Sequence, residues 1–211
     1  MAERTQAEFA YKELTRRILI LEIPPSERLK EEDWAKRLGV SRSAIRETLT
    51  RLQGEGLVQP GARGGFFASE MTEDDVHQIR ELREILEVAA FYFACDRANA
   101  PAIKELEEAC DDFSNLVKKG YFTGACEADL RFHRLLVGAS GNSRLSHAYQ
   151  KSNIPLFHMK LGRSRVYMDD FCETEKEHRM IVQALKSKEK KRGIELLRSH
   201  FSRGEKAITE S

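Results

Sequence analysis

The sequence predicts a mainly α-helical protein whose N-terminal third also carries one small β-hairpin. Two observations support this fold class. Apolar residues recur at helical spacing along most of the 211 residues, and a hairpin pattern occurs between residues 57 and 68. Strand signals disappear after Thr72. We therefore expect two domains, an N-terminal one over residues 1–70 and an all-helical one over residues 71–211.

The composition limits the class of protein. Charged residues make up 33% of the chain and aromatic residues 8%, as is typical of helix-rich soluble proteins. No apolar run approaches the roughly 18 residues that span a bilayer, and Met1 leads into polar sequence without a secretory signal. The four cysteines form no close pair, which argues against disulfides and a thiolate zinc site. We expect a protein of the reducing cytoplasm.

Three helices are predicted in the first domain, at residues 8–22, 31–38 and 42–55. Pro24 and Pro25 end the first, because proline lacks a backbone N–H and disturbs the preceding turn. Gly39 suits the bend between the second and third helices, since glycine tolerates positive φ. Ser41 is a natural N-cap for the third helix. This arrangement predicts a helix-turn-helix.

A β-hairpin follows these helices. The apolar pair Leu57-Val58 precedes the glycine-rich tip PGARGG, and the apolar run Phe66-Phe67-Ala68 follows it. Three helices followed by such a hairpin describe a winged helix-turn-helix.

The third helix has the features of a DNA-reading helix. The net charge of the chain is only +1, but six basic residues stand against two acidic ones between Lys36 and Arg63. Arg42, Ser43 and Arg46 lie near the helix N-terminus, away from its apolar stripe. A DNA major groove admits such a helix, whose N-terminal residues meet bases and phosphates. The alternative is an ordinary solvated helix face. Because the charges coincide with the turn motif, we favour DNA binding.

The second domain is predicted to be a bundle of about six helices, because amphipathic stretches follow one another along it. Gly120 and Gly124 lead into the third stretch, and Pro155 bends or breaks the fourth, which we expect over residues 145–159. The stretches begin near residues 74, 101, 128, 145, 174 and 192.

Four residues of the second domain form a candidate metal site. Asp129 and His133 are four residues apart on a helical pattern, so their side chains share one face. His178 and His200 lie on later helices. One carboxylate and three imidazoles suit Zn²⁺, Ni²⁺, Mn²⁺ or Fe²⁺, with open positions for water or a ligand. Spacing alone does not establish that the four converge, and packing or surface histidines are the alternative.

The sequence resembles the GntR family of bacterial transcription regulators, in its FadR-like branch with an all-helical effector domain. The resemblance runs through RLGVSRSAIRETLTRLQGEGLV and the wing GARGGFF, and then through RELREILEVAA, DLRFHRLLVGASGN, EHRMIVQAL and RSHF. The short second domain is similar to the VanR-type subgroup. There are departures: Ala44 stands where many members have proline, Trp34 replaces an aliphatic residue, and Lys188-Glu189 replaces the usual Gly-Asp.

The resemblance implies roles for individual residues: Arg42 and Arg46 are expected to contact the operator, and Ser41 and Ser43 to anchor phosphates. From its place before the second helix, Lys30 is expected to touch a phosphate. The slim, positive wing tip is expected to enter a minor groove with Arg63, Gly64 and Gly65.

Many FadR-like domains bind a metal through an Asp-x-x-x-His pair and two later histidines, which correspond here to Asp129, His133, His178 and His200. By analogy, the metal would accept the carboxylate of a small organic acid. Arg83 could pair with that acid; the alternative is a salt bridge with Glu84, Glu87 or Asp129. Arg163 and Arg165 could also line the pocket, whereas His77, His147 and His158 do not match the pattern.

Three functions can be compared for this combination of motifs. A ligand-responsive regulator, usually a repressor in this family, would act as a homodimer on a palindromic operator of double-stranded DNA. A second option keeps the regulator but makes the metal purely structural. A metal-dependent hydrolase is disfavoured, because no HEXXH arrangement or nucleophile–base pattern accompanies the site. We therefore expect a regulator rather than an enzyme.

Overall fold

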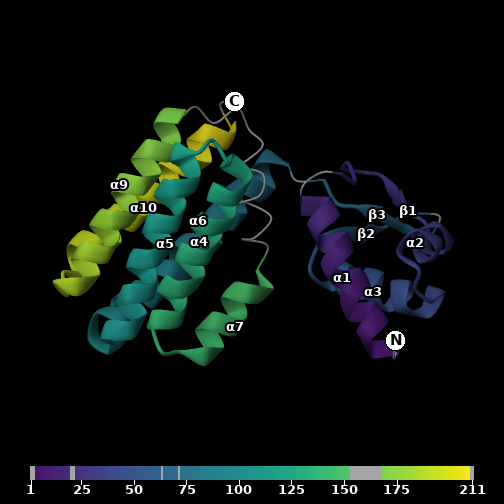
Figure 1. Ribbon diagram of the computed structural model, residues 1–211, viewed down its shortest axis with the longest axis horizontal. Helices are drawn as coiled ribbons and strands as arrows, with labels where there is room; N and C mark the ends of the chain where they lie inside the picture. Colours follow the sequence, from purple (N-terminus) through teal and green to yellow (C-terminus); the bar gives the residue numbers. More distant parts are fainter. Residues whose placement is uncertain (1–2, 20–21, 63, 71, 153–167, 210–211) are drawn as a thin grey trace. The chain divides into compact units, whose positions relative to one another are not determined.

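A computed structural model describes residues 3–19, 22–62, 64–70, 72–152 and 168–209. The chain divides into two compact units, Met1–Thr72 and Glu73–Ser211. Among the described residues, no helix combines the length and apolarity that a membrane span requires. The predicted fold class is confirmed: a small winged unit is followed by an all-helical one (Figure 1).

The helix-turn-helix forms as predicted. The N-terminal unit contains helices α1 (Glu3–Leu19), α2 (Glu31–Leu38) and α3 (Arg42–Gly54). Gly39 caps the end of α2 in the left-handed region, with φ 65°, where other residues would be strained. The Ser41 side chain caps α3 by accepting a hydrogen bond of 3.2 Å from the Ala44 backbone N–H. The turn therefore depends on two residues that follow one another closely.

Helix α1 differs from the prediction in its bounds and in its buried face. It begins at Glu3 and ends at Leu19, before the two prolines. Phe9 was expected in the apolar stripe but is 45% exposed, because Ala7 and Ala10 turn toward the core instead. The Thr48 hydroxyl of α3 donates to the Ala7 carbonyl at 3.1 Å. Such a close approach of α1 and α3 is possible because the contacting side chains of α1 are small.

The wing is a three-stranded antiparallel sheet in the order β1-β3-β2. Strands β2 (Val58–Pro60) and β3 (Phe66–Ala68) form the predicted hairpin, and Val58 pairs with Ala68. Strand β1 (Arg28–Leu29) adds to the other edge of β3, where Arg28 pairs with Phe67. The sequence did not predict β1, since two residues are too few to show an alternating pattern.

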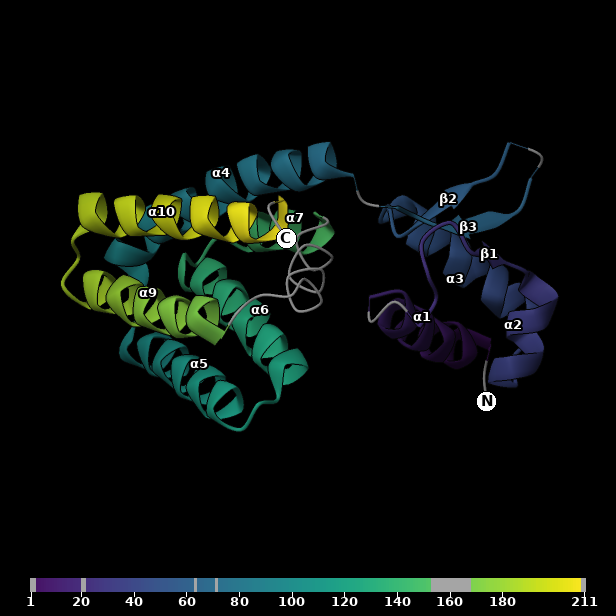
Figure 2. The same cartoon turned by 90° about the horizontal axis from the view of Figure 1, so that it is seen from above.

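The C-terminal unit is the predicted bundle. Helix α5 packs on α6, α9 lies between α5 and α10, and α4 contacts both α6 and α10 (Figure 2). The expected fourth helix ends at Lys151, and Pro155 lies outside the described residues. The helices are α4 (Glu73–Arg97), α5 (Ala100–Lys118), α6 (Phe122–Ala139), α7 (Ser143–Lys151), α9 (Met168–Lys186) and α10 (Lys190–Thr209).

Helix α6 begins earlier than predicted because Gly124 lies inside it rather than in the preceding connection. A β-carbon at Gly124 would stand 3.2 Å from a methyl group of Leu116 on α5. This glycine therefore allows α5 and α6 to approach closely. Gly120, with φ 72°, occupies the turn between the two helices, as expected.

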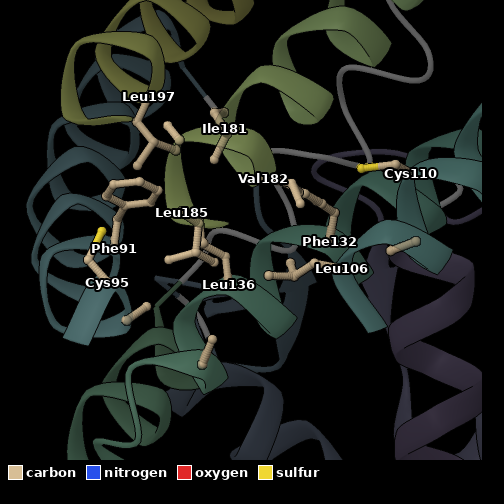
Figure 3. Packing of buried hydrophobic residues seen from close by; sticks show 14 of the residues in the cluster. Phe91, Cys95, Leu106, Cys110, Phe132, Leu136, Ile181, Val182, Leu185 and Leu197 are labelled. Carbon is tan, nitrogen blue, oxygen red and sulfur yellow. The ribbon is translucent and has the colours of Figure 1, made fainter. Parts of the chain in front are cut away.

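The core of the bundle draws on five helices (Figure 3). Phe91 of α4, Phe132 of α6 and Leu197 of α10 are fully buried in it. Gly193 lies on α10 against the Phe91 ring, and a β-carbon at this position would overlap the ring. The absence of a side chain at Gly193 is therefore required for α10 to pack against α4.

This contact predicts opposite effects of the same substitution at two positions of α10. Gly193→Ala adds about 1 kcal/mol of helix propensity, but the overlap with Phe91 costs about 1–3 kcal/mol in a packed core. Gly204→Ala is the matched control, because a β-carbon there meets no described atom within 4 Å. We expect Gly193→Ala to lower the midpoint of thermal unfolding and Gly204→Ala to raise it. Equal increases for both variants would contradict the described packing.

Candidate metal centre and nucleic-acid interface

The bundle brings the four predicted metal ligands together. Asp129 and His133 lie one turn apart on α6, while α9 supplies His178 and α10 supplies His200. All four residues are buried, with exposed fractions between 0% and 8%. Each offers one ligand atom, and these atoms all lie within 4.8 Å of one another. Residues up to 71 positions apart in sequence thus face a common point.

The distances within the cluster indicate where a cation would be held. His133 Nε2 and His200 Nε2 are 3.2 Å apart. His178 Nε2 lies 3.2 Å, and His133 Nε2 3.6 Å, from Asp129 Oδ1. Among the described residues, Asp129 is the only polar partner near His178 Nε2, without hydrogen-bond geometry, and the buried Nδ1 of His178 has no hydrogen-bond partner. A buried imidazole left in this way is costly, and a bound cation would satisfy its lone pair. The donor set fits a divalent transition metal.

Two carboxylates behind the cluster orient its imidazoles. Glu87 of α4 lies 2.5 Å from His133 Nδ1, and Glu177 of α9 lies 2.7 Å from His200 Nδ1. A carboxylate accepts a hydrogen bond, so each Nδ1 carries the proton and each Nε2 presents a lone pair to the cluster. This arrangement is the one that metal-ligating histidines require.

Both carboxylates are themselves held by other side chains. Arg83 Nε donates to Glu87 at 2.6 Å, and the Tyr149 hydroxyl of α7 donates to the same Glu87 oxygen at 2.9 Å. Arg203 of α10 donates to both oxygens of Glu177, at 2.9 and 2.7 Å. The network joins α4, α6, α7, α9 and α10 around the site.

Burial and neighbouring charges shift the pKa values of His178 and His200 toward the neutral form that binds a metal, and that of His133 away from it. Burial raises the pKa of Glu177, but hydrogen bonds from His200 and Arg203 outweigh it and lower the pKa to about 2. Burial lowers the pKa of His200 to about 3 and also lowers the pKa of His178. Burial opposes protonation of His133 as well, but the nearby acids Glu87 and Asp129 raise its pKa overall. A metal would therefore compete with a proton chiefly at His133.

The structure also places some of the other residues of this domain that the sequence analysis named. Arg83 forms the buried salt bridge with Glu87 that was the alternative to an effector contact. His77 is exposed and lies 2.6 Å from Glu205, and His147 is exposed on α7. Three positions named from the sequence lie outside the described residues, namely His158, Arg163 and Arg165.

The start of α3 presents the predicted nucleic-acid contacts to solvent. Arg42, Ser43 and Arg46 are exposed, and Lys30 is exposed at the position before α2. Ser41 has a structural task, since its hydroxyl caps Ala44 and lies 3.0 Å from the Ser43 hydroxyl. The guanidinium of Arg46 is bonded to Glu31 of α2, which the sequence did not single out.

The wing tip adopts a glycine conformation. Gly64 and Gly65 have φ of 82° and 89°, which favours residues without a β-carbon. Arg63 lies outside the described residues. The Arg28 side chain of β1 extends to the wing tip. Its guanidinium group lies 3.4 Å from the position that a β-carbon at Gly65 would occupy. Arg28 is therefore a further basic group at the wing, and the sequence carried no signal for it because β1 was not predicted.

The chain is similar to known proteins over almost its whole length. Residues 6–68 match the description "Bacterial regulatory proteins, gntR family", and residues 78–203 match the FCD domain. An uncharacterized transcriptional regulator of Bacillus subtilis, YdhC, is 32% identical over 195 residues, covering 91% of this chain and 86% of YdhC. The gluconate operon transcriptional repressor of Bacillus subtilis is 25% identical over 178 residues, covering 82% and 72% of the two chains.

Solved structures share the fold. A GntR transcriptional regulator from Rhodococcus sp. RHA1 is 20% identical with a TM-score of 0.83, covering 98% of this chain and 99% of that one. The metal-free FCD domain of another regulator is 22% identical with a TM-score of 0.53, covering 66% of this chain and 96% of that one.

The buried salt bridge of Glu87 predicts an unequal effect of two substitutions on α4. Glu87→Gln leaves the Arg83 guanidinium buried without its counter-charge, and breaking such a pair costs about 3–5 kcal/mol. Glu84 pairs with Arg80 and Arg198 nearer the surface, so Glu84→Gln should cost about 0–1 kcal/mol. Denaturant unfolding of the metal-free variants measures both. Equal losses of unfolding free energy would show that the buried network adds nothing specific.

Proposed function

Because the chain belongs to the GntR family of bacterial regulatory proteins and carries an FCD domain, it is a DNA-binding transcription regulator, and we propose that its FCD domain binds a divalent metal and a small organic acid. Its relatives are transcriptional regulators rather than enzymes, in agreement with the sequence prediction. The match of residues 78–203 to the FCD domain also agrees with the FadR-like C-terminal domain that the sequence predicted. Membership of the VanR-type subgroup and residence in the cytoplasm are proposals that rest on the sequence.

We propose that α3 reads the operator through Arg42 and Arg46. The exposure of both side chains near the start of α3 supports this assignment. Arg46 would contact guanine, because a guanidinium offers paired donors that match O6 and N7. The residues proposed to contact the sugar-phosphate backbone or the minor groove are Lys30, Ser41, Ser43, Arg63, Gly64 and Gly65.

The convergence of Asp129, His133, His178 and His200 carries the proposal of a metal site. All four are buried and within reach of one ion, and two of the imidazoles have a carboxylate behind them. Metal-ligating histidines nearly always have such a partner. Zn²⁺, Ni²⁺, Mn²⁺ and Fe²⁺ all suit this donor set.

A buried guanidinium group near the metal ligands supports an acidic effector. One buried guanidinium group accompanies three buried carboxylates, so the buried cluster has two excess negative charges when its imidazoles are neutral. A divalent ion would neutralise this excess, so that net negative charge would not oppose binding of an acid. Arg83, which already holds Glu87, is the proposed contact for that carboxylate. The buried carboxylates are those of Glu87, Asp129 and Glu177.

We propose that the regulator is a homodimer that binds a palindromic operator and releases it when the effector binds. The presence of a repressor such as the gluconate operon regulator among its relatives supports negative control. Helix α4 begins at Glu73, directly after the N-terminal unit, and carries Glu87. A change at the metal site would therefore act on the helix that leads to the DNA-binding unit. In the second option the metal is structural and no acid binds.

Arg46→Ala tests the DNA contact. We expect operator affinity to fall by about 10-fold or more, since a bidentate guanine contact contributes about 1–3 kcal/mol, while the thermal unfolding midpoint changes little. The control is Lys104→Ala on α5, which removes the same charge from an exposed pair with Glu108. Gel-shift titration at fixed salt measures both variants. Unchanged affinity of Arg46→Ala would refute the assignment.

His178→Ala tests the metal site. Zinc should raise the thermal unfolding midpoint of the chelator-stripped wild type, because a ligand that binds only the folded state stabilises it. We expect this shift to disappear in His178→Ala. His147→Ala is the matched control, since His147 is exposed on α7. A shift that persists in His178→Ala would place the zinc elsewhere.

A screen of small carboxylates on the zinc-loaded protein separates the two options for the metal. An effector should raise the unfolding midpoint further and weaken operator binding in a gel shift. The effector should cause neither change in His178→Ala, because this variant is expected not to bind the metal. If zinc stabilises the protein and no carboxylate adds to this, the metal is structural.

A further inference from the structure

The strongest feature outside the metal centre is an ion pair within the DNA-reading surface. Glu31, in the first turn of α2, accepts two hydrogen bonds from Arg46 of α3, from Nε at 2.9 Å and from one Nη at 3.0 Å. Arg42 lies 4.0 Å from the same carboxylate. An acidic group in this position is unexpected, because it repels the phosphates that the surface must approach.

The geometry suggests what this acid does. The two bonds occupy the side edge of the guanidinium, which consists of Nε and one Nη. The end edge, which both Nη atoms form, is the other edge with paired donors, and paired donors match O6 and N7 of guanine. The Arg46 side chain is 67% exposed, while the Glu31 side chain is only 19% exposed. The acid is thus a largely buried partner of an exposed side chain that is proposed to read bases.

We propose that Glu31 is a specificity-determining residue that orients Arg46 for an end-on contact with guanine. Arginine carries about 2 kcal/mol of side-chain entropy, and a partner that holds its fork in advance reduces the loss on binding. Repulsion between Glu31 and phosphates weakens binding to every sequence. Only an operator with guanine in the correct position recovers this loss, which is how a repulsive element produces specificity. The proposal rests on the proposed Arg46 contact.

A competing role would be simple masking. If Glu31 only occupied Arg46 until DNA displaced it, removing the acid would strengthen binding to all DNA. The orienting role requires a different result: binding to the operator weakens, while binding to other DNA is unchanged or stronger. The ratio of the two affinities therefore distinguishes the roles.

The experiment begins with the wild-type full-length protein, which selects a consensus duplex from a random pool. Affinities for this duplex and for a scrambled duplex of equal composition are then measured at one salt concentration. The variants are Glu31→Ala, Glu31→Gln and Arg46→Ala. Glu32→Ala is the matched control, because Glu32 is the next acid on α2 and pairs with Lys36 instead.

We expect Glu31→Ala to lower the ratio of consensus to scrambled affinity about 10-fold, Glu31→Gln to lower it less, and Glu32→Ala to leave it unchanged. Replacing the consensus guanines with 7-deazaguanine, which lacks N7, should weaken wild-type binding but have a smaller effect in Glu31→Ala. A purely structural role for Glu31 would not change this sensitivity to one base atom.

Three outcomes would overturn the inference. In one, Glu31→Ala raises both affinities equally, as masking requires. In another, the ratio and the 7-deazaguanine effect in Glu31→Gln and Glu31→Ala match those of Glu32→Ala. In the last, Arg46→Ala retains operator affinity, and the proposed contact itself then fails. Loss of binding by Arg46→Ala with no effect of Glu31→Ala rejects only the orienting role.

Discussion

The hydrogen bonds that Glu87 makes in the interior of the FCD domain are the constraint on which the rest of the site depends. One carboxylate of α4 bonds to Arg83 on its own helix, His133 on α6 and Tyr149 on α7. A charge buried in this way is tolerated only when every partner is in place. The bonds therefore fix three helices relative to one another and, with them, the direction of the His133 lone pair.

A carboxylate also holds a side chain of another helix at a second place in the site, and again between α2 and α3. Glu177 holds His200 while Arg203 holds Glu177, and Glu31 holds Arg46. In each case a carboxylate on one helix holds, on another helix, a side chain for which a binding role is proposed. Helix α4 carries Glu87 and begins directly after the N-terminal unit, so the proposed metal site is built partly on the helix that is next in sequence to that unit.

Much of this organisation could be predicted from the sequence. Gly39 and Ser41 identified the helix-turn-helix, because a left-handed turn and an N-cap are local requirements. Asp129 and His133 identified one face of α6 for the same reason. The partners behind the ligands were different: Glu87 was considered only as a possible salt-bridge partner of Arg83, and the sequence predicted no contact between Glu177 and a ligand. The spacing of acidic residues along an amphipathic helix does not show which carboxylate is buried and which is solvated. Only the packing of the other helices decides this.

The central claim is that two buried carboxylates orient the imidazoles of His133 and His200 so that their nitrogens converge, with His178 and Asp129, on one metal ion. X-ray absorption spectroscopy of the zinc-loaded protein tests it most directly. The account predicts one zinc per chain, a first shell of nitrogen and oxygen only, and the scattering signature of three imidazoles. A sulfur ligand, fewer than three imidazoles, or less than one zinc per chain would contradict it.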